Sequence, residues 1–348
     1  MSYQALKWCR NKLILLDQRK LPFKRAYVEC KNVKDVWRAI NNLTVRGAPL
    51  IGVTAGFGVY LGIKDSPARN YSSFREDFEK VVSYLALSRP TAINLFWVLE
   101  RMKNLLEQNR SMPIRKIKKL ILEEAKMIME EERWVCRKIA DWGEKLIKNG
   151  DRVLTYCNTG ALATVEYGTA LGVITRAKEK GKRIEVFVCE TRPFLQGARL
   201  TCWELKEKKV PFTLICDNMA ATLIAQGKVN KIFVGSDRTV ANGDTANKVG
   251  TYNLAVLAYY HRIPFYVVCP SSSFDFGIRT GKDIPIEERP QEEILYIMNR
   301  RIAPYGIKAY YPCFDVTPGK LITAIVTEKG IFRRPYLKSL RRLKKVRS

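Results

Sequence analysis

The sequence predicts an α/β protein. We expect a Rossmann-like parallel sheet flanked by helices in the C-terminal part, and a smaller, mainly helical N-terminal domain with a few short strands. Two observations support this. Long stretches of helical periodicity fill the chain up to residue 148, and short β-rich runs alternate with helical segments from residue 152 onward. Because 348 residues suit about two domains of ~150 residues each, we predict domains at 1–148 and 149–348.

In the N-terminal part, the pattern predicts extended runs at 12–16 and 27–30 and helical runs at 36–43 and 114–147. The apolar stretch 47–63 contains several glycines and Pro49. It is shorter than the ~20 residues that span a bilayer, so we interpret it as a buried helix and expect no membrane partner. Asn149-Gly150 is a typical helix stop before the second domain.

Polar residues follow each strand predicted in the C-terminal part. The strands are expected at 153–156, 184–189, 212–216, 231–234 and 265–268. The segments after them are Cys157-Asn158-Thr159-Gly160, where a helix is predicted to start at once, Glu190-Thr191-Arg192-Pro193, Asp217-Asn218, Gly235-Ser236-Asp237-Arg238 and Pro270-Ser271-Ser272-Ser273. Ligands of open α/β sheets bind beyond the carboxyl ends of the strands. Chance polar loops are the alternative, but five in succession favour a site.

Composition limits the classes of function. The formal net charge of +27 is compatible with nucleic-acid binding, with a basic proteome or with attraction of anionic substrates. The one concentrated basic run, 333–348, is interpreted as a solvated tail. We expect no signal peptide, and cysteines within apolar runs (Cys189, Cys216, Cys269) indicate reduced core thiols in a cytoplasmic protein.

The side chains available for catalysis are few. The one histidine, His261, falls in a predicted helix tail, which disfavours His-based metal sites and a Ser-His-Asp triad. Cys157 and Asp237 remain as an acid and a base. A helix start after Cys157 would lower the pKa of its thiol. The alternatives are an inert buried cysteine, and an ion pair between Asp237 and Arg238.

Turns that lead into predicted helices offer sites for an anion. Arg46-Gly47-Ala48-Pro49 and Arg89-Pro90-Thr91 each place a guanidinium before a helix, and Asn247-Lys248 is predicted to begin another. The sequence contains neither a GxGxxG fingerprint nor a GxxxxGK[ST] loop, so nucleotide binding has no support.

Several long motifs resemble those of methylthioribose-1-phosphate isomerases. They include Val45-Arg46-Gly47-Ala48-Pro49, the run from Ser88 to Leu95, Cys157-Asn158-Thr159-Gly160-Ala161-Leu162-Ala163-Thr164, the run from Glu190 to Arg199, Gly235-Ser236-Asp237-Arg238, Ala241-Asn242-Gly243-Asp244, the run from Asn247 to Tyr252, and Phe314-Asp315-Val316-Thr317-Pro318. The resemblance covers about residues 12 to 331. It departs from the family pattern at Tyr156, Thr159, Ser236, Thr239 and Cys313.

The resemblance implies specific roles. Cys157 and Asp237 match the family's catalytic pair, and a set of seven residues matches its substrate-contacting positions: Arg46, Gly47, Ala48, Arg89, Gln196, Asn247 and Lys248. It also implies a fold shared with regulatory subunits of the translation-initiation exchange factor and with ribose-1,5-bisphosphate isomerases. A homodimer, a part in methionine salvage, and a reaction without cofactor or metal are further expectations.

Three functions stay open at this stage. The first is isomerisation of 5-methylthioribose 1-phosphate. The second is the same reaction on ribose 1,5-bisphosphate or 5-deoxyribose 1-phosphate, because Tyr156 and Thr159 border Cys157. The third is a non-enzymatic regulatory or RNA-binding role, with nucleic acid bound at most non-specifically through the basic surface. Which of Cys157 and Asp237 is the base also stays open.

Overall fold

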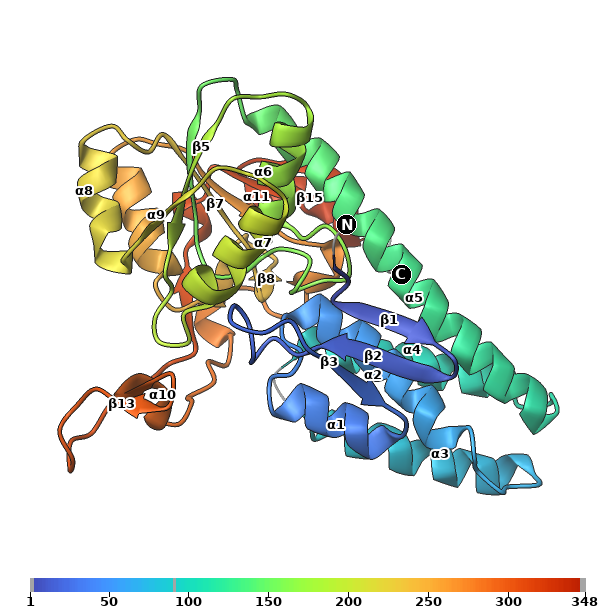
Figure 1. Ribbon diagram of the computed structural model, residues 1–348. Helices are drawn as coiled ribbons and strands as arrows, with labels where there is room; N and C mark the ends of the chain where they lie inside the picture. Colours follow the sequence, from blue (N-terminus) through green and yellow to red (C-terminus); the bar gives the residue numbers. More distant parts are fainter. Residues whose placement is uncertain (1–2, 90–91, 345–348) are drawn as a thin grey trace. The chain divides into compact units, whose positions relative to one another are not determined.

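The computed structural model describes residues 3–89 and 92–344, without the side chain of the last (Figure 1). The chain divides into two compact units. The N-terminal unit comprises the chain up to Trp134 together with Ala161–Glu166, and the C-terminal unit comprises Val135–Gly160 and the chain from Tyr167 onward. The domain boundary between 148 and 149 stays a prediction.

The N-terminal unit combines a small antiparallel sheet with packed helices. Its elements are β1 (Leu6–Cys9), β2 (Lys12–Leu16), β3 (Tyr27–Cys30), α1 (Val33–Asn41), α2 (Ala48–Ile63), α3 (Tyr71–Ala86), α4 (Ile93–Gln108) and the first part of α5 (Ile114–Gly143). Helix α2 is the predicted buried helix, and 12 of its 16 residues are buried. Its glycines allow close packing, since a Cβ on Gly58 would lie 2.7 Å from Val36 and one on Gly62 would lie 2.6 Å from Val81.

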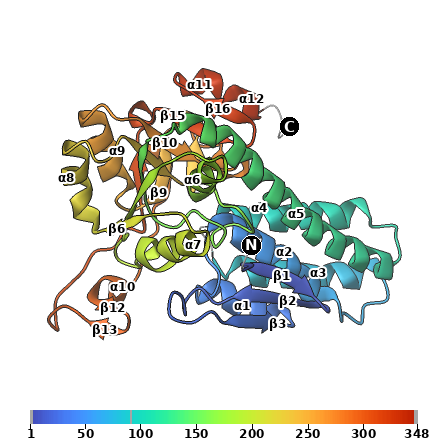
Figure 2. The same cartoon turned by 45° about the horizontal axis from the view of Figure 1, so that its top comes forward.

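The C-terminal unit is built on a seven-stranded sheet (Figure 2). Its strands are β4 (Arg152–Thr155), β5 (Glu185–Cys189), β6 (Thr213–Ile215), β7 (Lys231–Val234), β10 (Phe265–Val268), β15 (Ala324–Thr327) and β16 (Gly330–Phe332), in the order β16-β15-β10-β7-β4-β5-β6. All neighbours are parallel except β15 and β16. The five predicted strands are confirmed, and β15 and β16 were not anticipated.

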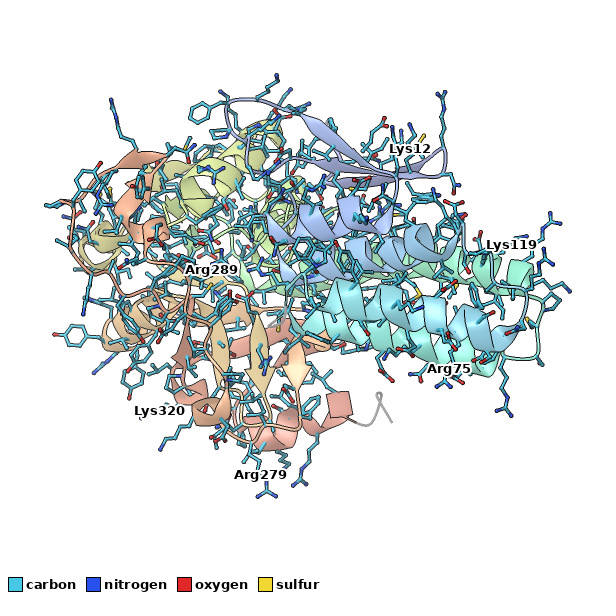
Figure 3. The ribbon with its side chains drawn as sticks, turned by 90° about the horizontal axis from the view of Figure 1, so that it is seen from below. Lys12, Arg75, Lys119, Arg279, Arg289 and Lys320 are labelled. Carbon is cyan, nitrogen blue, oxygen red and sulfur yellow. The ribbon has the colours of Figure 1, made fainter. Side chains whose placement is uncertain are left out.

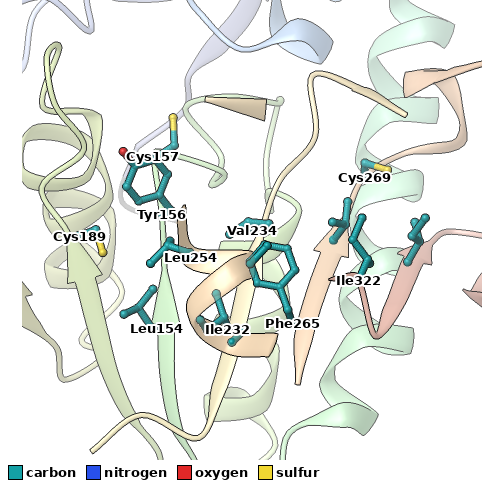
Figure 4. Close-up of a cluster of buried hydrophobic side chains, with 14 of the residues drawn as sticks. Leu154, Tyr156, Cys157, Cys189, Ile232, Val234, Leu254, Phe265, Cys269 and Ile322 are labelled. Carbon is teal, nitrogen blue, oxygen red and sulfur yellow. The ribbon is translucent and has the colours of Figure 1, made fainter. Parts of the chain in front are cut away.

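Each face of this sheet is covered by its own apolar core. Helices α6 (Ala170–Glu179) and α7 (Cys202–Glu207) and the end of α5 pack on one face. Helices α8 (Ala220–Ala225) and α9 (Thr251–Tyr260) pack on the other, in the cluster drawn in Figure 4. Side chains of one strand alternate between the faces, with Val153 in the first core and Leu154 in the second. This is the predicted Rossmann-like arrangement.

A second, four-stranded sheet contains β11 (Phe274–Asp275), β8 (Arg238–Val240), β9 (Thr245–Lys248) and β14 (Phe314–Thr317), in that order. Further along the chain, α10 (Glu292–Leu295) leads into the β12 (Tyr296–Ile297) and β13 (Arg300–Arg301) hairpin. The prediction that Asn247-Lys248 begins a helix is wrong. Both residues belong to β9, where they pair with Asp315 and Phe314, and α9 begins only at Thr251.

The described basic side chains between residues 333 and 342 are exposed, as expected for a solvated tail, but apolar side chains of the same segment are packed against the domain. The segment contains α11 (Tyr336–Ser339) and α12 (Arg341–Lys344). Tyr336, Leu340 and Leu343 are buried in the second core, and the Tyr336 hydroxyl donates to the carbonyl of Ile322 at 3.0 Å. Residues 345–348 lie outside the described part of the chain.

Basic side chains are distributed over the surfaces of both units, as Arg75, Lys119 and Lys320 illustrate (Figure 3). Among the cysteines, Cys189 and Cys269 are buried as predicted, whereas Cys216 is exposed, contrary to expectation. None of the helices in the described ranges has the length and apolar character needed to cross a membrane.

Candidate active site

The order of the strands creates a switch point between β4 and β7. From β4 the chain adds β5 and β6 on one side, and it then returns to add β7, β10 and β15 on the other. Crevices at such switch points, outside the carboxyl ends of the strands, are where open α/β sheets bind ligands. Cys157 follows β4 and Asp237 follows β7, so the two predicted catalytic residues lie at the ends of the two strands that flank the switch point.

The turn after β4 bends sharply at Cys157. This residue has a φ of 62°, in the left-handed region that non-glycine residues seldom adopt. Its backbone N–H donates to Thr191 Oγ1 at 2.9 Å, and its carbonyl accepts from Thr201 Oγ1 at 2.6 Å. The expected helix start is wrong, because α6 begins only at Ala170. A helix dipole therefore does not account for a reactive thiol at Cys157.

The end of β7 packs closely against the same turn. A Cβ added to Gly235 would lie 2.7 Å from Thr159 Cγ2, so a side chain there would push the two strand ends apart. Two residues further on, the half-buried Asp237 donates its N–H to the carbonyl of Ala246 in β9 at 3.0 Å. Arg238, the ion-pair partner suggested for Asp237, lies 3.6 Å from Asp275.

Strand β9 brings Asn247 and Lys248 into this region, both buried. Asn247 Nδ2 donates to Thr251 Oγ1 at 2.9 Å, and its Oδ1 would lie 3.9 Å from a Cβ on Gly235. Lys248 Nζ donates to the Tyr311 hydroxyl and lies 3.5 Å from Cys313 Sγ. Burial raises the pKa of Tyr311, its neighbours Cys313 and Glu293 raise it further, and the charge of Arg289 lowers it.

Asp315, in β14, is the most perturbed carboxyl group of this region. Burial raises its pKa to about 6, although its oxygens accept hydrogen bonds from the N–H groups of Gly250 and Tyr252 at the start of α9. Those bonds and the charge of Lys248 act in the opposite direction and limit the rise. Asp315 thus caps a helix while spending much of its time protonated near pH 6.

Gln196 also belongs to the C-terminal unit. It is buried and precedes a π-helical turn, Gly197–Thr201. Gln196 Oε1 has no hydrogen-bond partner among the described residues, so it is available to a ligand's donor group. A Cβ on Gly197 would lie 3.0 Å from Thr191 Oγ1, the atom that accepts from the Cys157 N–H. The structure therefore brings Cys157, Asp237, Gln196, Asn247 and Lys248 into one region.

The other predicted binding residues belong to the N-terminal unit and form a corner of their own. Arg46 and Gly47 precede α2, which begins at Ala48, and Arg89 precedes α4. The two helix starts are close, because a Cβ on Gly52 would lie 2.9 Å from the carbonyl of Asn94. Arg89 Nη1 is buried and lacks a hydrogen-bond partner within residues 3–89 and 92–344. Two neighbouring helix N-termini, each with an arginine shortly before it in the sequence, are suited to an anion. Pro90 and Thr91 of the predicted motif lie outside the described residues.

Sequence reasoning placed Thr191 only within a polar strand end, and it missed three other residues of the Cys157 region: Thr201, Glu204 and Tyr311. Glu204 is fully buried, and Oε1 accepts from Asn158 Nδ2 at 2.7 Å. A single acidic residue in the run Cys202-Trp203-Glu204-Leu205 was the one available signal for it. Thr201 gave no signal of its own, because the partners of a hydroxyl group depend on the fold.

Comparisons with known proteins place the chain in a family. The model described as "Initiation factor 2 subunit family" matches residues 44–334. The chain therefore belongs to the initiation factor 2 subunit family. Among its relatives, the methylthioribose-1-phosphate isomerase of Caldicellulosiruptor saccharolyticus is 51% identical over 334 residues, which are 96% of this chain and 97% of that protein.

Two solved structures are similar over nearly the whole chain. The 5-methylthioribose 1-phosphate isomerase from Pyrococcus horikoshii OT3 has a TM-score of 0.92 and 44% identity, covering 99% of this chain and 96% of that one. A structure described as translation initiation factor eIF-2B, subunit delta, from A. fulgidus has a TM-score of 0.87 and 43% identity, covering 98% and 99%. These likenesses confirm the fold class that the sequence predicts.

Proposed function

We propose that this protein is an aldose-ketose isomerase that converts 5-methylthioribose 1-phosphate to 5-methylthioribulose 1-phosphate, with Cys157 and Asp237 as its acid-base pair. The observation that carries the proposal is the position of these two residues at the ends of β4 and β7, on either side of the switch point. Full-length relatives at about half identity that carry the isomerase name support the choice of substrate.

The reaction has to open a ring that is locked as a glycosyl phosphate. One of the two residues removes the proton from carbon 2, and the electron pair of that bond forms the double bond between carbons 1 and 2. The bond from carbon 1 to the ring oxygen breaks, and the other residue protonates that oxygen. The resulting enol phosphate loses its hydroxyl proton as carbon 1 gains one, which gives the ketose phosphate. We favour Cys157 as the base and Asp237 as the acid, and the reverse assignment balances equally.

The predicted binding residues supply the remaining interactions. Arg46, Gly47, Ala48 and Arg89 would bind the phosphate, because the N–H groups at the start of α2 and the buried Arg89 Nη1 are donors suited to an anion. Gln196, Asn247 and Lys248 would contact the sugar hydroxyls through their buried polar groups. No step of this mechanism requires a cofactor or a metal.

The decisive experiment assays the purified protein against three sugar phosphates: 5-methylthioribose 1-phosphate, ribose 1,5-bisphosphate and 5-deoxyribose 1-phosphate. We expect the highest kcat/KM with the first. A higher kcat/KM with either of the others would mean that the protein isomerises that sugar phosphate instead. Turnover of none of them would favour a non-enzymatic role, and the name of the A. fulgidus structure, a translation initiation factor subunit, offers one candidate.

We also propose a homodimer. In the C-terminal unit, α9 exposes a row of large apolar side chains, and the turn before α8 and the β12–β13 hairpin expose others: Tyr252, Val256, Tyr259 and Tyr260; Met219; Met298. Apolar surface of this extent is typical of an interface between copies. Sedimentation of the purified protein should give twice the chain mass, and a monomer at micromolar concentration would refute it.

A cytoplasmic enzyme of methionine salvage is the biological setting that the isomerase name supports. Nucleic acid would bind only non-specifically, through the basic side chains spread over both units. The affinity for a fluorescent oligonucleotide should then fall steeply with salt. Tight, sequence-selective binding at physiological salt would contradict this.

A further inference from the structure

We propose that Thr191 and Thr201 are positioning residues that hold Cys157 in its left-handed conformation, and that Asn158 and Glu204 set the direction of the Thr201 hydrogen bond. The inference rests on the proposed role of Cys157 as a catalytic residue. All five residues belong to the C-terminal unit.

The backbone of Cys157 is held by side chains rather than by the sheet. Its N–H donates to Thr191 Oγ1 at 2.9 Å, and its carbonyl accepts from Thr201 Oγ1 at 2.6 Å. A φ of 62° is strained for a residue with a Cβ, and strain of this kind persists only where the surroundings enforce it. The two threonine hydroxyls thus decide where the Cys157 thiol lies.

The direction of the Thr201 hydrogen bond follows from the groups behind it. The Glu204 carboxylate only accepts, so Asn158 must turn its Nδ2 toward it, at 2.7 Å. The same Nδ2 lies 3.2 Å from Thr201 Oγ1, which therefore accepts from Asn158. The single hydroxyl proton of Thr201 is left to donate to the Cys157 carbonyl.

The surroundings leave little room for another arrangement. A Cβ on Gly160 would lie 2.3 Å from a Glu204 carboxylate oxygen, and Thr191 is held by the Asp217 carboxylate, which accepts from its N–H at 2.8 Å. Glu204 is fully buried, in a place where an apolar side chain would be less costly to bury. The presence of a buried carboxylate at this position is consistent with a role of Glu204 in orienting Asn158 and the Thr201 hydroxyl.

Two matched pairs of variants test the proposal. Thr201→Val keeps the shape of the side chain and removes the hydroxyl, whereas Thr201→Ser keeps the hydroxyl. Thr191→Val and Thr191→Ser form the second pair, which serves if Thr201→Val does not fold. Each valine variant should lower kcat about 10- to 100-fold, the cost of a misplaced reacting group, with KM changed less than about 3-fold. Each serine variant should recover most of the loss.

A second readout does not depend on isomerase activity. The rate at which iodoacetamide alkylates Cys157, followed by peptide mass spectrometry across pH, reports the reactivity of this thiol alone. The pH midpoint of this rate should shift in the valine variants and return in the serine variants. Valine variants with wild-type kcat and a wild-type alkylation profile would overturn the proposal. If the wild type turns over no sugar phosphate, the proposed function fails, and the alkylation profile alone then decides whether the threonines position Cys157.

Discussion

Two cysteines follow parallel strands of the same sheet and belong to the same apolar core, but their backbones are held in different ways (Figure 4). Cys269 continues β10, because its N–H donates to the carbonyl of Val326 in β15 at 3.0 Å. Cys157 does not continue strand β4. Its φ is left-handed, and its N–H donates to the Thr191 hydroxyl instead of a strand carbonyl. In Figure 4 its sulfur points away from the cluster.

The comparison separates two thiols that are buried in the core from Cys157, the thiol that we propose to be reactive. Burial raises the pKa of the Cys269 thiol to about 12, so this residue stays a neutral, inert part of the core. Burial raises the pKa of Cys189 in β5 as well. Cys157 has a similarly small exposed fraction, 8%, but it lies at the switch point among polar groups. If Cys157 is catalytic, as we propose, its position at the end of the strand distinguishes it from the other two thiols better than its depth of burial does.

The largest effect that would test this comparison is the loss of the Cys157 thiol. Cys157→Ser should lower kcat at least ~100-fold, the low end for a positioned acid or base, with an unchanged circular dichroism spectrum. Cys189→Ala, a matched variant within the same core, should keep kcat close to wild type. Near wild-type turnover in Cys157→Ser would show that Cys157, like Cys189 and Cys269, is not catalytic.

Asp237→Asn should have an effect of similar size. The amide preserves the shape of the side chain but neither donates nor removes a proton, so turnover should fall at least ~100-fold. Steady-state kinetics beside a thermal unfolding curve separate lost chemistry from lost fold. A variant with normal kcat would limit Asp237 to a structural role after β7.

Much of this arrangement is predictable from sequence, and two of the failures share one cause. The strands at 231–234 and 265–268 match β7 and β10, because buried parallel strands are continuous apolar runs. The helix expected after Gly160 does not form. In its place, the Leu162 carbonyl accepts from Gln18 Nε2 at 2.6 Å and the Ala163 carbonyl accepts from the Leu50 N–H at 3.2 Å. Contacts with residues more than a hundred positions away override local helix propensity there.

The same cause explains a second error. Asn247 and Lys248 form a strand because they pair with β14, whose sequence lies far along the chain. In the C-terminal segment, the spacing of Tyr336, Leu340 and Leu343 is that of one helix face. The charge of the surrounding residues obscured this pattern. Deletion of residues 333–348 would therefore remove core side chains, and a truncation that tests the basic tail should begin after Leu343.

Arg46→Ala tests the binding side of the proposal and should have a smaller effect. Losing a charge-assisted hydrogen bond to the phosphate should cost about 1.5–3 kcal/mol, seen mainly as a higher KM. Arg75→Ala, which removes an exposed arginine of the same unit, is the control and should leave KM unchanged. If KM and kcat of Arg46→Ala both equal those of the wild type, Arg46 is structural only.

The smallest expected effect is the contribution of the buried Asp315 carboxyl group to the pH dependence of the free energy of unfolding. The pKa of Asp315 is about 6 in the native protein and near 3.8 in the unfolded chain, so the native state binds more protons between these values. The stability from this group is fully present below about pH 4 and is lost as the pH rises through 6. A shift of this size corresponds to about 3 kcal/mol at most, less where solvent screens the group. Urea unfolding of wild type and Asp315→Asn from pH 4.5 to 7.5 should give free energies that diverge, with the wild type losing stability relative to the variant as pH rises. Parallel curves would mean that Asp315 stays ionised, and that its bonds to the α9 N–H groups outweigh its burial.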